Sequence, residues 1–373
     1  MNDHSGDEIA RDSPSSHRKR KLGLLLILLL CLLAALLLSP LVGSVRVPVV
    51  DVIGIELHHL TGGAFPANPC PAQLSVAGNV DSCSTIDTLI VDNRLPEIFL
   101  ALFVGMGLAT VGGTMQGVFR NPLADPYLFG ISSGAALGAA ATLFVSGMLF
   151  QDATLYLPLF AFLGAMGTGS IVLLASRSVR SSPETLLLTG VAVGTLFGGM
   201  ISLLTTFRAS SEALFITFWF LGSFSGATWP MVGLAFAGIA AGSSLLMLHG
   251  RDLNLLQLGD ETAAGLGADV KSIRRRLILI SSFVTAMAVA FCGIVGFVGL
   301  ISPHVVRRLQ GPDYRMLLPA SALFGGLFLV LADDLASSVL SGGGILPVGV
   351  ITAFVGAPFF LWILNRRLRG RAV

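Results

Sequence analysis

Long apolar runs separated by short polar connections make up most of this chain. A helix needs about 20 apolar residues to cross the hydrocarbon core of a bilayer. The run at 297–309 is short, and Gly299 and Pro303 interrupt it. We predict an all-α fold, a polytopic transmembrane helical bundle with about ten spans. The predicted spans are 22–42, 94–118, 126–149, 154–176, 184–207, 228–249, 276–296, 297–309, 316–340 and 346–365.

Polar segments flank and interrupt this membrane domain, which we place at 22–368. Residues 1–21 are polar and end in a basic cluster, which predicts a disordered basic tail in the cytoplasm. Residues 44–92 form one long segment that we expect on the external side. Within it, Val49–Leu60 could form a short interfacial helix, and the Gly- and Pro-rich stretch that follows is typical of a loop.

A second long connection, 250–275, is longer than packing two neighbouring spans requires. It predicts two short helices, the second with Asp260 at its N-cap and Gly267 ending it. Short helices with exposed apolar faces form a surface for a partner protein. A solvated linker is the alternative interpretation.

Composition agrees with a membrane protein. Only 12% of the 373 residues are charged and 54% are hydrophobic, whereas a soluble domain carries about 25% charged residues. The spacing of the charges then predicts orientation, because cytoplasmic loops carry an excess of Lys and Arg. Basic clusters precede the first span, follow the last and occupy alternate connections, so both termini are expected in the cytoplasm. These basic residues are Arg18, Lys19, Arg20 and Lys21; Arg177 and Arg180; Lys271, Arg274, Arg275 and Arg276; Arg307, Arg308 and Arg315; and Arg366, Arg367, Arg369 and Arg371.

The spans fall into two halves that look alike in outline. Both 94–207 and 276–365 begin with a span flanked by Arg and continue through one interrupted by Gly or Pro. Five spans separate the two starts, so the halves would cross the membrane in opposite directions. Inverted halves of this kind are common in transporters.

The four cysteines divide between two environments. Cys31 and Cys292 lie in apolar runs, where packing is their expected role. Cys70 and Cys83 lie in the external segment, where the oxidising compartment favours a disulfide between them, and two free thiols remain the alternative. The nearby His58 does not complete a standard zinc-ligand spacing.

Motifs for chemistry are few. No Lys follows a Gly anywhere, so the chain has no phosphate-binding loop of the Gly-x-x-x-x-Gly-Lys type. Ionisable residues within or beside the spans are functional candidates, but Asp333, Asp334, His304 and Glu184 form no clear proton relay. We interpret them as anchoring, packing or helix-start residues.

Residues 130–134 match Gly-x-Ser-x-Gly, the nucleophile pattern of hydrolases, with Ser132 at its centre. That pattern requires a strand–turn–helix context and partner His and Asp residues. Here it opens a Gly- and Ala-rich membrane helix, so close helix contact is the favoured interpretation.

Two prolines in 121–126 forbid a continuous helix between the second and third spans. Asn121 and Asp125 can cap the helix ends that such a break creates. Broken helices at membrane depth occur where they line a cavity or gate. An ordinary cytoplasmic turn is the alternative.

Several segments together resemble the permease family of type II ABC importers, the FecCD or BtuC-like family, which carries ferric siderophores, haem or cobalamin. The resemblance covers roughly residues 22–368. The segments that carry it are Arg94–Pro96, Gly107–Gly117, Asn121–Ala135, Leu186–Gly190, Gly259–Gly267, Gly296–Arg307 and Leu346–Phe360.

The resemblance implies a multi-pass permease in the cytoplasmic (inner) membrane that makes and breaks no covalent bonds. Its implied partners are a second permease subunit, with a homodimer favoured, two cytoplasmic ATPases that hold ATP and Mg, and an external binding protein. No cofactor of this chain and no nucleic acid is implied. An ion- or proton-driven secondary transporter is the alternative, and an intramembrane hydrolase using Ser132 is a third class.

The resemblance also assigns roles to residues. The segment 259–267 would dock into the ATPase, and Arg94 would pair with a carboxylate of the binding protein on the outer rim. The cytoplasmic gate would comprise Asn121, Leu123, Pro183 and Glu184. The ATPase-coupling residues would be Gly259, Asp260, Glu261, Ala264, Leu266 and Gly267.

Two positions depart from the family pattern. Family members often carry a second rim Arg where this chain has Ser337, and a Glu where it has Ile345. The usual salt bridge of the second lobe is therefore not expected here. The external segment 61–92 is also longer than the family leads us to expect, and it could supplement docking or cover the entrance.

Overall fold

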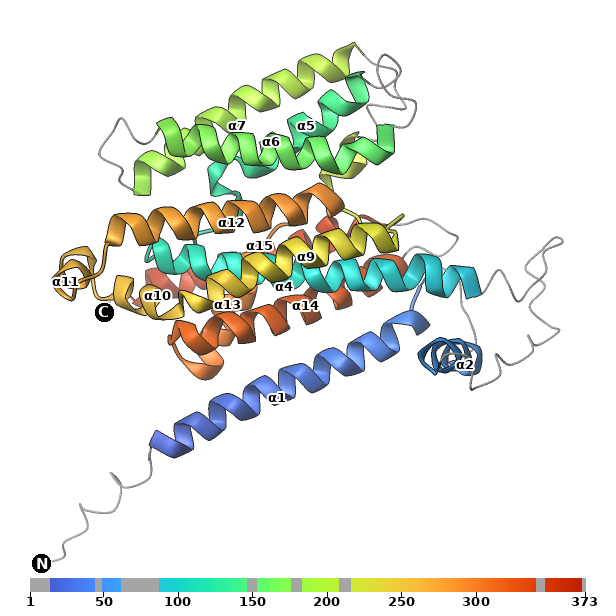
Figure 1. Ribbon diagram of the computed structural model, residues 1–373, viewed down its shortest axis with the longest axis horizontal. Helices are drawn as coiled ribbons and strands as arrows, with labels where there is room; N and C mark the ends of the chain where they lie inside the picture. Colours follow the sequence, from blue (N-terminus) through green and yellow to red (C-terminus); the bar gives the residue numbers. More distant parts are fainter. Residues whose placement is uncertain are drawn as a thin grey trace, which may run out of the picture.

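A computed structural model describes residues 14–43, 49–61, 87–145, 153–175, 183–207, 216–339 and 346–370. All regular secondary structure in these ranges is helical, which confirms the predicted fold class (Figure 1). The first half contains α1 (Pro14–Leu38), η2 (Ser39–Leu41), α2 (Val49–Leu60), η3 (Leu89–Arg94), α4 (Leu95–Val118), η4 (Pro126–Phe129), α5 (Ile131–Val145), α6 (Ala153–Ala175) and α7 (Pro183–Thr206). The second contains α9 (Trp229–Leu248), α10 (Gly250–Gln257), α11 (Asp260–Gly265), α12 (Val270–Cys292), α13 (Val298–Gln310), α14 (Tyr314–Val339) and α15 (Val348–Gly370).

Eight helices in the described ranges are long and apolar enough to cross a membrane. The remaining two of the ten predicted spans are shorter, because α5 has 15 residues and α13 has 13. At a rise of 1.5 Å per residue, each covers only part of a hydrocarbon core about 30 Å thick. The predicted span at 126–149 is therefore wrong at its start, where Pro126 opens a short 3₁₀ turn and α5 begins only at Ile131.

The polar segments also differ in detail from the sequence predictions. Helix α1 begins at Pro14, inside the predicted tail. Helix α2 occupies Val49–Leu60, as predicted, and crosses the bundle direction near one end of the molecule (Figure 1). Cys70 and Cys83, with their predicted disulfide, lie outside the described residues.

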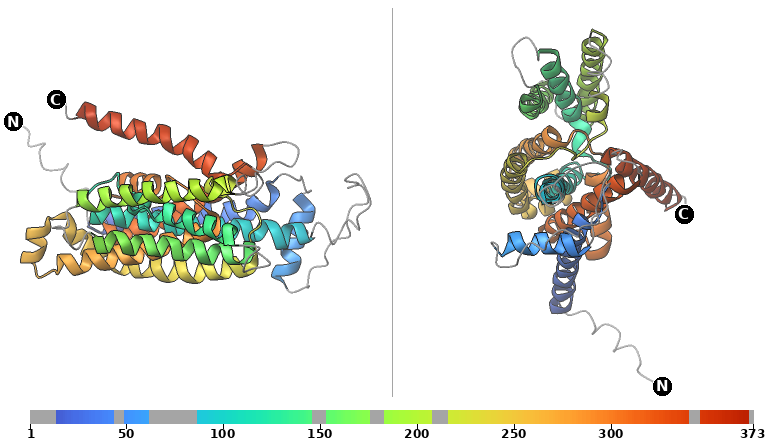
Figure 2. Two further views of the ribbon diagram at one scale, coloured as in Figure 1. Left: turned by 90° about the horizontal axis from the view of Figure 1, so that it is seen from above. Right: turned by 90° about the vertical axis from the view of Figure 1, so that its right-hand side faces the viewer.

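Helix α4 forms the centre of the bundle. Helices α14, α9, α12 and α13 pack around it, while α5, α6 and α7 form a group on one side, α1 lies on the opposite side, and α15 projects sideways (Figure 2). Close packing relies on glycine, because a Cβ at Gly105 would meet the Gly325 carbonyl and one at Gly112 would meet Gly299. Small residues at such contacts let helix backbones approach in a membrane.

The two halves repeat one order of elements. In each, a long helix (α4 or α12) is followed by a break, a short helix (α5 or α13) and two long helices. Helix α4 ends at the end of the bundle where α12 begins, so the two run in opposite directions (Figure 1). This arrangement agrees with the inverted halves that the sequence predicts.

Candidate functional site

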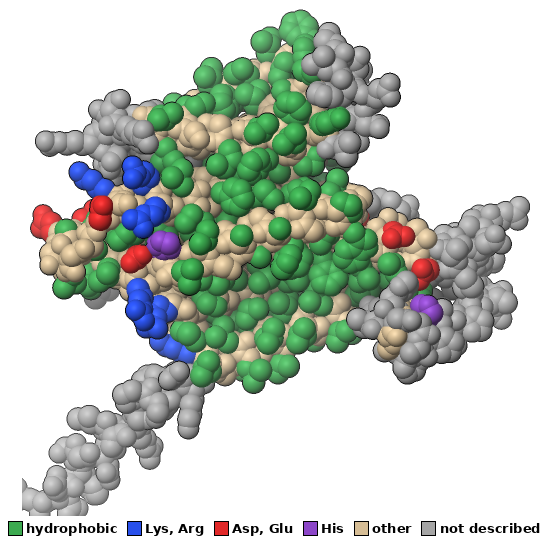
Figure 3. All heavy atoms as spheres, viewed as in Figure 1, with side chains coloured by type: hydrophobic (Ala, Val, Ile, Leu, Met, Phe, Trp, Pro, Cys, Tyr) green, Lys and Arg blue, Asp and Glu red, His purple; other side chains and the backbone are tan. Residues whose placement is uncertain are grey.

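Lys and Arg side chains gather at one end of the bundle, beside α10 and α11, while the flank of the bundle is covered by apolar side chains (Figure 3). We call this the basic end. Ion pairs of Lys21, Arg120 and Arg274 lie here. The ends of α4, α9 and α13 and the starts of α12 and α14 all meet the same region.

The connection 250–275 folds into the two short helices that the sequence predicts. Leu253 and Leu256 of α10 are fully buried and anchor it against the bundle. Ala263 of α11 is buried, whereas Leu258 and Leu266, which flank this helix, keep 57% and 63% of their surface exposed. The helix therefore rests on one small residue and presents apolar side chains outward.

The ends of α11 depend on two glycines. Gly259 and Gly267 have φ of 104° and 89°, a backbone region that side chains other than glycine rarely adopt. Gly267 ends the turn as predicted. The predicted N-cap was wrong by one residue, because Gly259 is the N-cap and Asp260 is the first residue of the helix.

The Asp260 carboxylate instead joins three segments. Its Oδ1 accepts a hydrogen bond from Arg120 Nη2 at 2.8 Å, and Arg274 Nη2 donates to both oxygens at 3.1 Å. Arg120 follows the end of α4, and Arg274 lies in the second turn of α12. Paired guanidinium donors of this kind fix geometry as well as charge.

Helix α4 ends in a Schellman motif. The Arg120 N–H donates to the Gly117 carbonyl at 3.3 Å, and the Asn121 N–H donates to the Gln116 carbonyl at 3.1 Å. Arg120 thus takes the left-handed position, φ 50°, which glycine usually fills. Gln257 of α10 also donates to the Gly117 carbonyl, at 2.9 Å. The end of α4 is therefore tied to the connection 250–275 twice.

The chain then turns back into the bundle. Asn121 Oδ1 accepts from the Leu123 N–H at 3.0 Å, and Asp125 Oδ1 accepts from the Tyr127 N–H at 2.8 Å, which caps η4. A Cβ at Gly299 would lie within about 3 Å of both Pro126 and the Leu108 carbonyl. Because Leu108 lies ten residues before the end of α4, Pro126 sits roughly 15 Å inside the bundle.

The structure therefore favours a broken, re-entrant segment at 121–126 over an ordinary turn. Tyr127 Oη donates to the Val295 carbonyl at 2.9 Å, in the break between α12 and α13. Each half thus places its break against the other. Irregular backbone is stable at membrane depth only where protein or a cavity surrounds it.

A second polar group supports the basic end from within. Gln116, which is buried, accepts from Arg307 Nη1 at 2.9 Å and donates to the Gly299 carbonyl at 3.3 Å. Arg307 also reaches the hydroxyl of Tyr314 and stacks on its ring, 5.8 Å from the centroid. These contacts hold α4, α13 and α14 together near α10 and α11.

Asp313 organises the start of α14. It accepts from Asn254 Nδ2 at 2.8 Å and pairs with Lys21 at 3.7 Å. Burial alone would raise the pKa of Asp313, but hydrogen bonds from Asn254 and from the Arg315 N–H, with the charges of Lys21 and Arg315, hold this pKa below its ordinary value. The carboxylate is therefore charged at neutral pH and joins α1, α10 and α14.

The predicted gate residues are only partly described. Asn121 is exposed and Leu123 is half-buried at the start of the re-entrant segment. Pro183 is the first residue of α7, but the side chains of Pro183 and Glu184 lie outside the described residues. A described contact between α7 and the re-entrant region is at Gly130, where a Cβ would lie 3.0 Å from the Gly190 carbonyl.

Arg94 lies at the opposite end of the bundle, with its side chain turned inward. Its Nη1 donates to the Pro40 carbonyl at 2.7 Å, its guanidinium packs on Gly43, and only 9% of its surface is exposed. The guanidinium closes the turn after α1, whereas the resemblance gives it a carboxylate of the binding protein as its partner. Its role in docking a binding protein stays a prediction.

Two other ionisable residues singled out from the sequence, Asp334 and His304, contact neighbouring elements. Asp334 accepts from the Ser39 hydroxyl, which anchors α14 to η2, and His304 stacks edge-to-face on Phe359. Ser337, at the position of the family's second rim Arg, is half-buried, and Ile345 lies outside the described residues. No group of three or more His, Cys, Asp or Glu residues in the described ranges could hold a metal ion.

The Gly-x-Ser-x-Gly match opens α5 and serves helix packing. A Cβ at Gly134 would meet Thr168 and the Gly164 carbonyl of α6. The described chain around Ser132 contains a 3₁₀ turn and a helix rather than the strand that a nucleophile elbow requires. The packing interpretation is therefore favoured by the structure.

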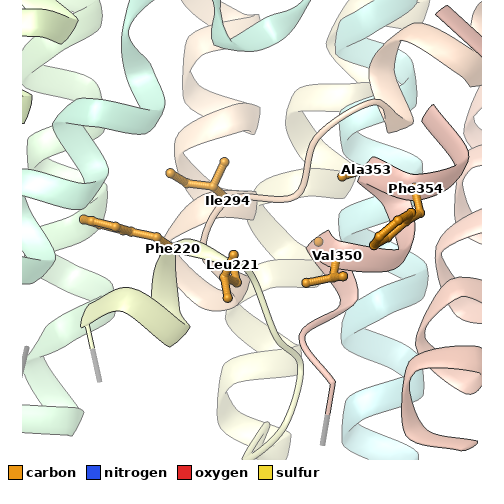
Figure 4. Close-up of a pocket in the computed structure, with 7 residues that line it drawn as sticks. Phe220, Leu221, Ile294, Val350, Ala353 and Phe354 are labelled. Atoms are coloured by element: carbon orange, nitrogen blue, oxygen red, sulfur yellow. The ribbon is translucent and has the colours of Figure 1, made fainter. Parts of the chain in front are cut away.

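Helices α7 and α15 are among those that leave broad apolar faces open. On α7, the large side chains of Leu188, Leu196 and Leu203 each expose at least 60% of their surface. On α15, Phe354 exposes 76% and lies beside a hollow of about 250 Å³ (Figure 4). This hollow lies where the break after α12 faces α15, and its lining residues are Phe220, Leu221, Ile294, Gly349, Val350, Ala353 and Phe354.

Sequence reasoning found the two short helices of 250–275 and the broken segment, but it missed Arg120, Arg274 and the Gln116–Arg307 pair. Arg120 carried one local signal, since an Arg directly before Asn-Pro stands where a helix must end. The partners of these residues lie 14 to 191 positions away in the chain. Single-sequence patterns do not pair residues over such separations.

Comparisons with known proteins agree with this architecture. The model of the FecCD transport family matches residues 27–366. The cobalamin import system permease protein of Halobacterium salinarum is 42% identical over 287 residues, covering 76% of this chain and 75% of its own. The hemin transport system permease protein of Yersinia pestis is 40% identical over 280 residues, covering 75% and 84%.

Two further similarities extend over most of the chain. An Fe(3+)-citrate import system permease protein of Bacillus subtilis is 36% identical over 335 residues, covering 89% of this chain and 96% of its own. A solved structure of a metal-chelate type ABC transporter in an inward-facing conformation is 31% identical, with a TM-score of 0.74, covering 92% and 98%. With its helical bundle, its broken segments and these relatives, the chain belongs to the FecCD transport family.

Proposed function

We propose that this chain is the permease subunit of an ATP-driven ABC importer that moves a ferric siderophore from an external binding protein into the cytoplasm. Membership of the FecCD family supports the permease role. Relatives named for cobalamin, hemin and Fe(3+)-citrate support a bulky chelate or macrocycle as the substrate class. Ferric siderophore is our first choice, and haem and cobalamin are the other candidates. ATP and Mg would bind the separate ATPase subunits.

The observation that carries the proposal is the exposed docking surface on α11. It combines the outward apolar side chains of Leu258 and Leu266 with the left-handed Gly267, and it lies at the basic end. The excess of Lys and Arg there supports a cytoplasmic position for this end and for both termini. A cytoplasmic ATPase could then bind Gly259, Asp260, Glu261, Ala264, Leu266 and Gly267.

The open faces of α7 and α15 suit a second permease subunit. Two subunits that meet through such faces would enclose a path between them, and the small side chains on α7 suit a bulky ligand. The residues that line a hollow on α7 are Ala192, Thr195, Leu196, Gly199, Met200 and Leu203. We favour a homodimer, with Asn121, Leu123, Pro183 and Glu184 near the cytoplasmic gate and Arg94 near the external docking face.

The test is reconstitution in proteoliposomes with the cognate ATPase and binding protein. Radiolabelled ferric citrate, a ferric hydroxamate siderophore, haemin and cyanocobalamin are each offered outside, with and without ATP inside. We expect ATP-dependent uptake of one of these compounds, and a ferric siderophore is our first choice. Uptake that persists without any ATPase and collapses with the proton gradient would instead indicate a secondary transporter.

The docking surface is tested within the same assay by two substitutions at one position. Gly267→Trp adds bulk to the proposed interface, and Gly267→Ala imposes the same left-handed backbone strain with little bulk. We expect Trp to abolish ATP-driven uptake and co-purification of the ATPase, and Ala to retain most of both. Equal activity of the two variants would exclude Gly267 from the interface.

A further inference from the structure

We infer that Arg120 and Asp260 form a coupling link, which delivers movement of the docking helix α11 to the re-entrant segment at 121–126. The inference rests on the proposed function, because it assumes that a cytoplasmic ATPase moves α11. It assigns positioning roles to both residues, and Arg120 in particular was not singled out by the sequence. The link acts through geometry and does not contact the substrate.

The first support is the way Arg120 ends α4. In a Schellman motif, the left-handed position is usually glycine, because a side chain there strains the backbone. Arg120 holds this position with φ 50° and both motif hydrogen bonds in place. A glycine would end the helix at lower cost, so the side chain of Arg120 has a use other than ending α4.

The second support is the partner of that side chain. Arg120 Nη2 lies 2.8 Å from Asp260 Oδ1, which Arg274 Nη2 also contacts at 3.1 Å. The Arg120 and Asp260 side chains expose 42% and 43% of their surface. Ion pairs this exposed contribute little to folding stability. Stability alone therefore does not account for the strained residue.

The third support is what lies on either side of the link. On one side, Asp260 opens α11, which presents Leu266 and Gly267 outward. On the other, Arg120 is directly followed by the re-entrant stretch, which starts with a turn closed by the Ala124 N–H on the Asn121 carbonyl and ends at Pro126, packed against Gly299. A displacement of α11 would pull on the hinge between α4 and this stretch. Coupling carried by a contiguous chain of contacts needs such a direct connection.

The experiment uses the full complex in proteoliposomes with whichever chelate the wild-type complex imports, and measures chelate imported per ATP hydrolysed. Arg120→Gly keeps the helix end but removes the link. We expect this ratio to fall at least about fivefold, the lower end of the range for coupled sites. Thermal stability should stay equal or rise, and the ATPase should still co-purify. Arg120→Lys, which keeps a cation near Asp260, should restore much of the ratio.

The matched control is Lys21→Gln, which removes another ion pair at the basic end, with Asp313. It should leave the ratio of import to hydrolysis within about twofold of wild type, because exposed pairs contribute little on their own. A wild-type ratio in Arg120→Gly would overturn the link, and so would lower thermal stability or loss of the ATPase in that variant. If the wild-type complex imports none of the chelates, the proposed function is wrong, and the link, which depends on it, is rejected as well.

Discussion

Helices α4 and α7 have almost the same length and apolar character but opposite surroundings. Their spans have mean hydropathies of 1.9 and 1.7, yet 83% of the first is buried in the bundle and only 11% of the second. Helix α4 packs on its neighbours through glycine and carries buried polar side chains with partners. Helix α7 exposes its leucines and its small residues alike.

The difference separates two uses of the same residue types. Glycine in α4 lets backbones touch, as at Gly112 and Gly299, whereas Gly198 and Gly199 of α7 have open space where a side chain would lie. Within one chain, α4 is therefore a core helix that packs closely against its neighbours up to the basic end. Helix α7 presents an uncovered apolar surface, which we assign to contact with the second subunit and to the substrate path.

The largest predicted effect comes from adding one methyl group at matched glycines. Gly112→Ala would push a Cβ into the Gly299 backbone, and we expect a loss of about 3 kcal/mol or more in unfolding free energy. Gly198→Ala meets nothing and should stabilise the helix by roughly 0.5–1 kcal/mol. Thermal unfolding of each purified chain in detergent measures both. Changes of the same sign and size would refute the comparison.

A smaller effect is expected from removing one polar side chain from each helix. Gln116→Leu would leave Arg307 Nη1 and the Gly299 carbonyl without this partner in a buried position, at a cost of about 1–3 kcal/mol. Thr195→Val removes only a bond within α7, from Thr195 to the Val191 carbonyl, and should change stability by less than about 0.5 kcal/mol. The same unfolding assay applies. A Gln116→Leu chain as stable as wild type would show that this pair is dispensable.

Single cysteine substitutions on α7 and α6 should change stability least. Labelling them in the assembled transporter tests directly whether the α7 face meets water. With the four native cysteines replaced, Thr195→Cys should react with a membrane-impermeant maleimide, because thiolate forms only where water reaches the sulfur. Leu163→Cys on α6, whose wild-type side chain is 53% exposed, should react far more slowly because lipid covers it. Equal rates would place the α7 face against lipid.

Particular elements show how much of the fold the sequence predicted. Hydrophobic runs located the long helices, and Gly and Asp near 259–267 located the docking helix and its end at Gly267. The prolines at 122 and 126 revealed the broken segment. The pattern showed that the run of α13 is short, but not that α5 is short, because the apolar run of α5 begins within the preceding 3₁₀ turn.

The roles of single residues were also predicted only in part from the sequence. The motif at Arg94 indicated an outer-rim position but not that Pro40 and Gly43 enclose the guanidinium. Capping rules placed an acid near the start of α11, yet Asp260 turns to Arg120 and Arg274 instead of the helix backbone. Local rules describe a residue's own turn, and a partner far along the chain can outweigh them.

The sequence by itself determined that this protein is an all-helical membrane bundle with broken helices, since the bilayer requires apolar spans and prolines forbid continuous ones. Only the tertiary structure decided which apolar helix is core and which is open surface, because lipid and protein interior are equally apolar. It alone also placed Arg120, Asp260 and Arg274 together. Their contact depends on three segments meeting at one end of the bundle, and no local pattern encodes that meeting.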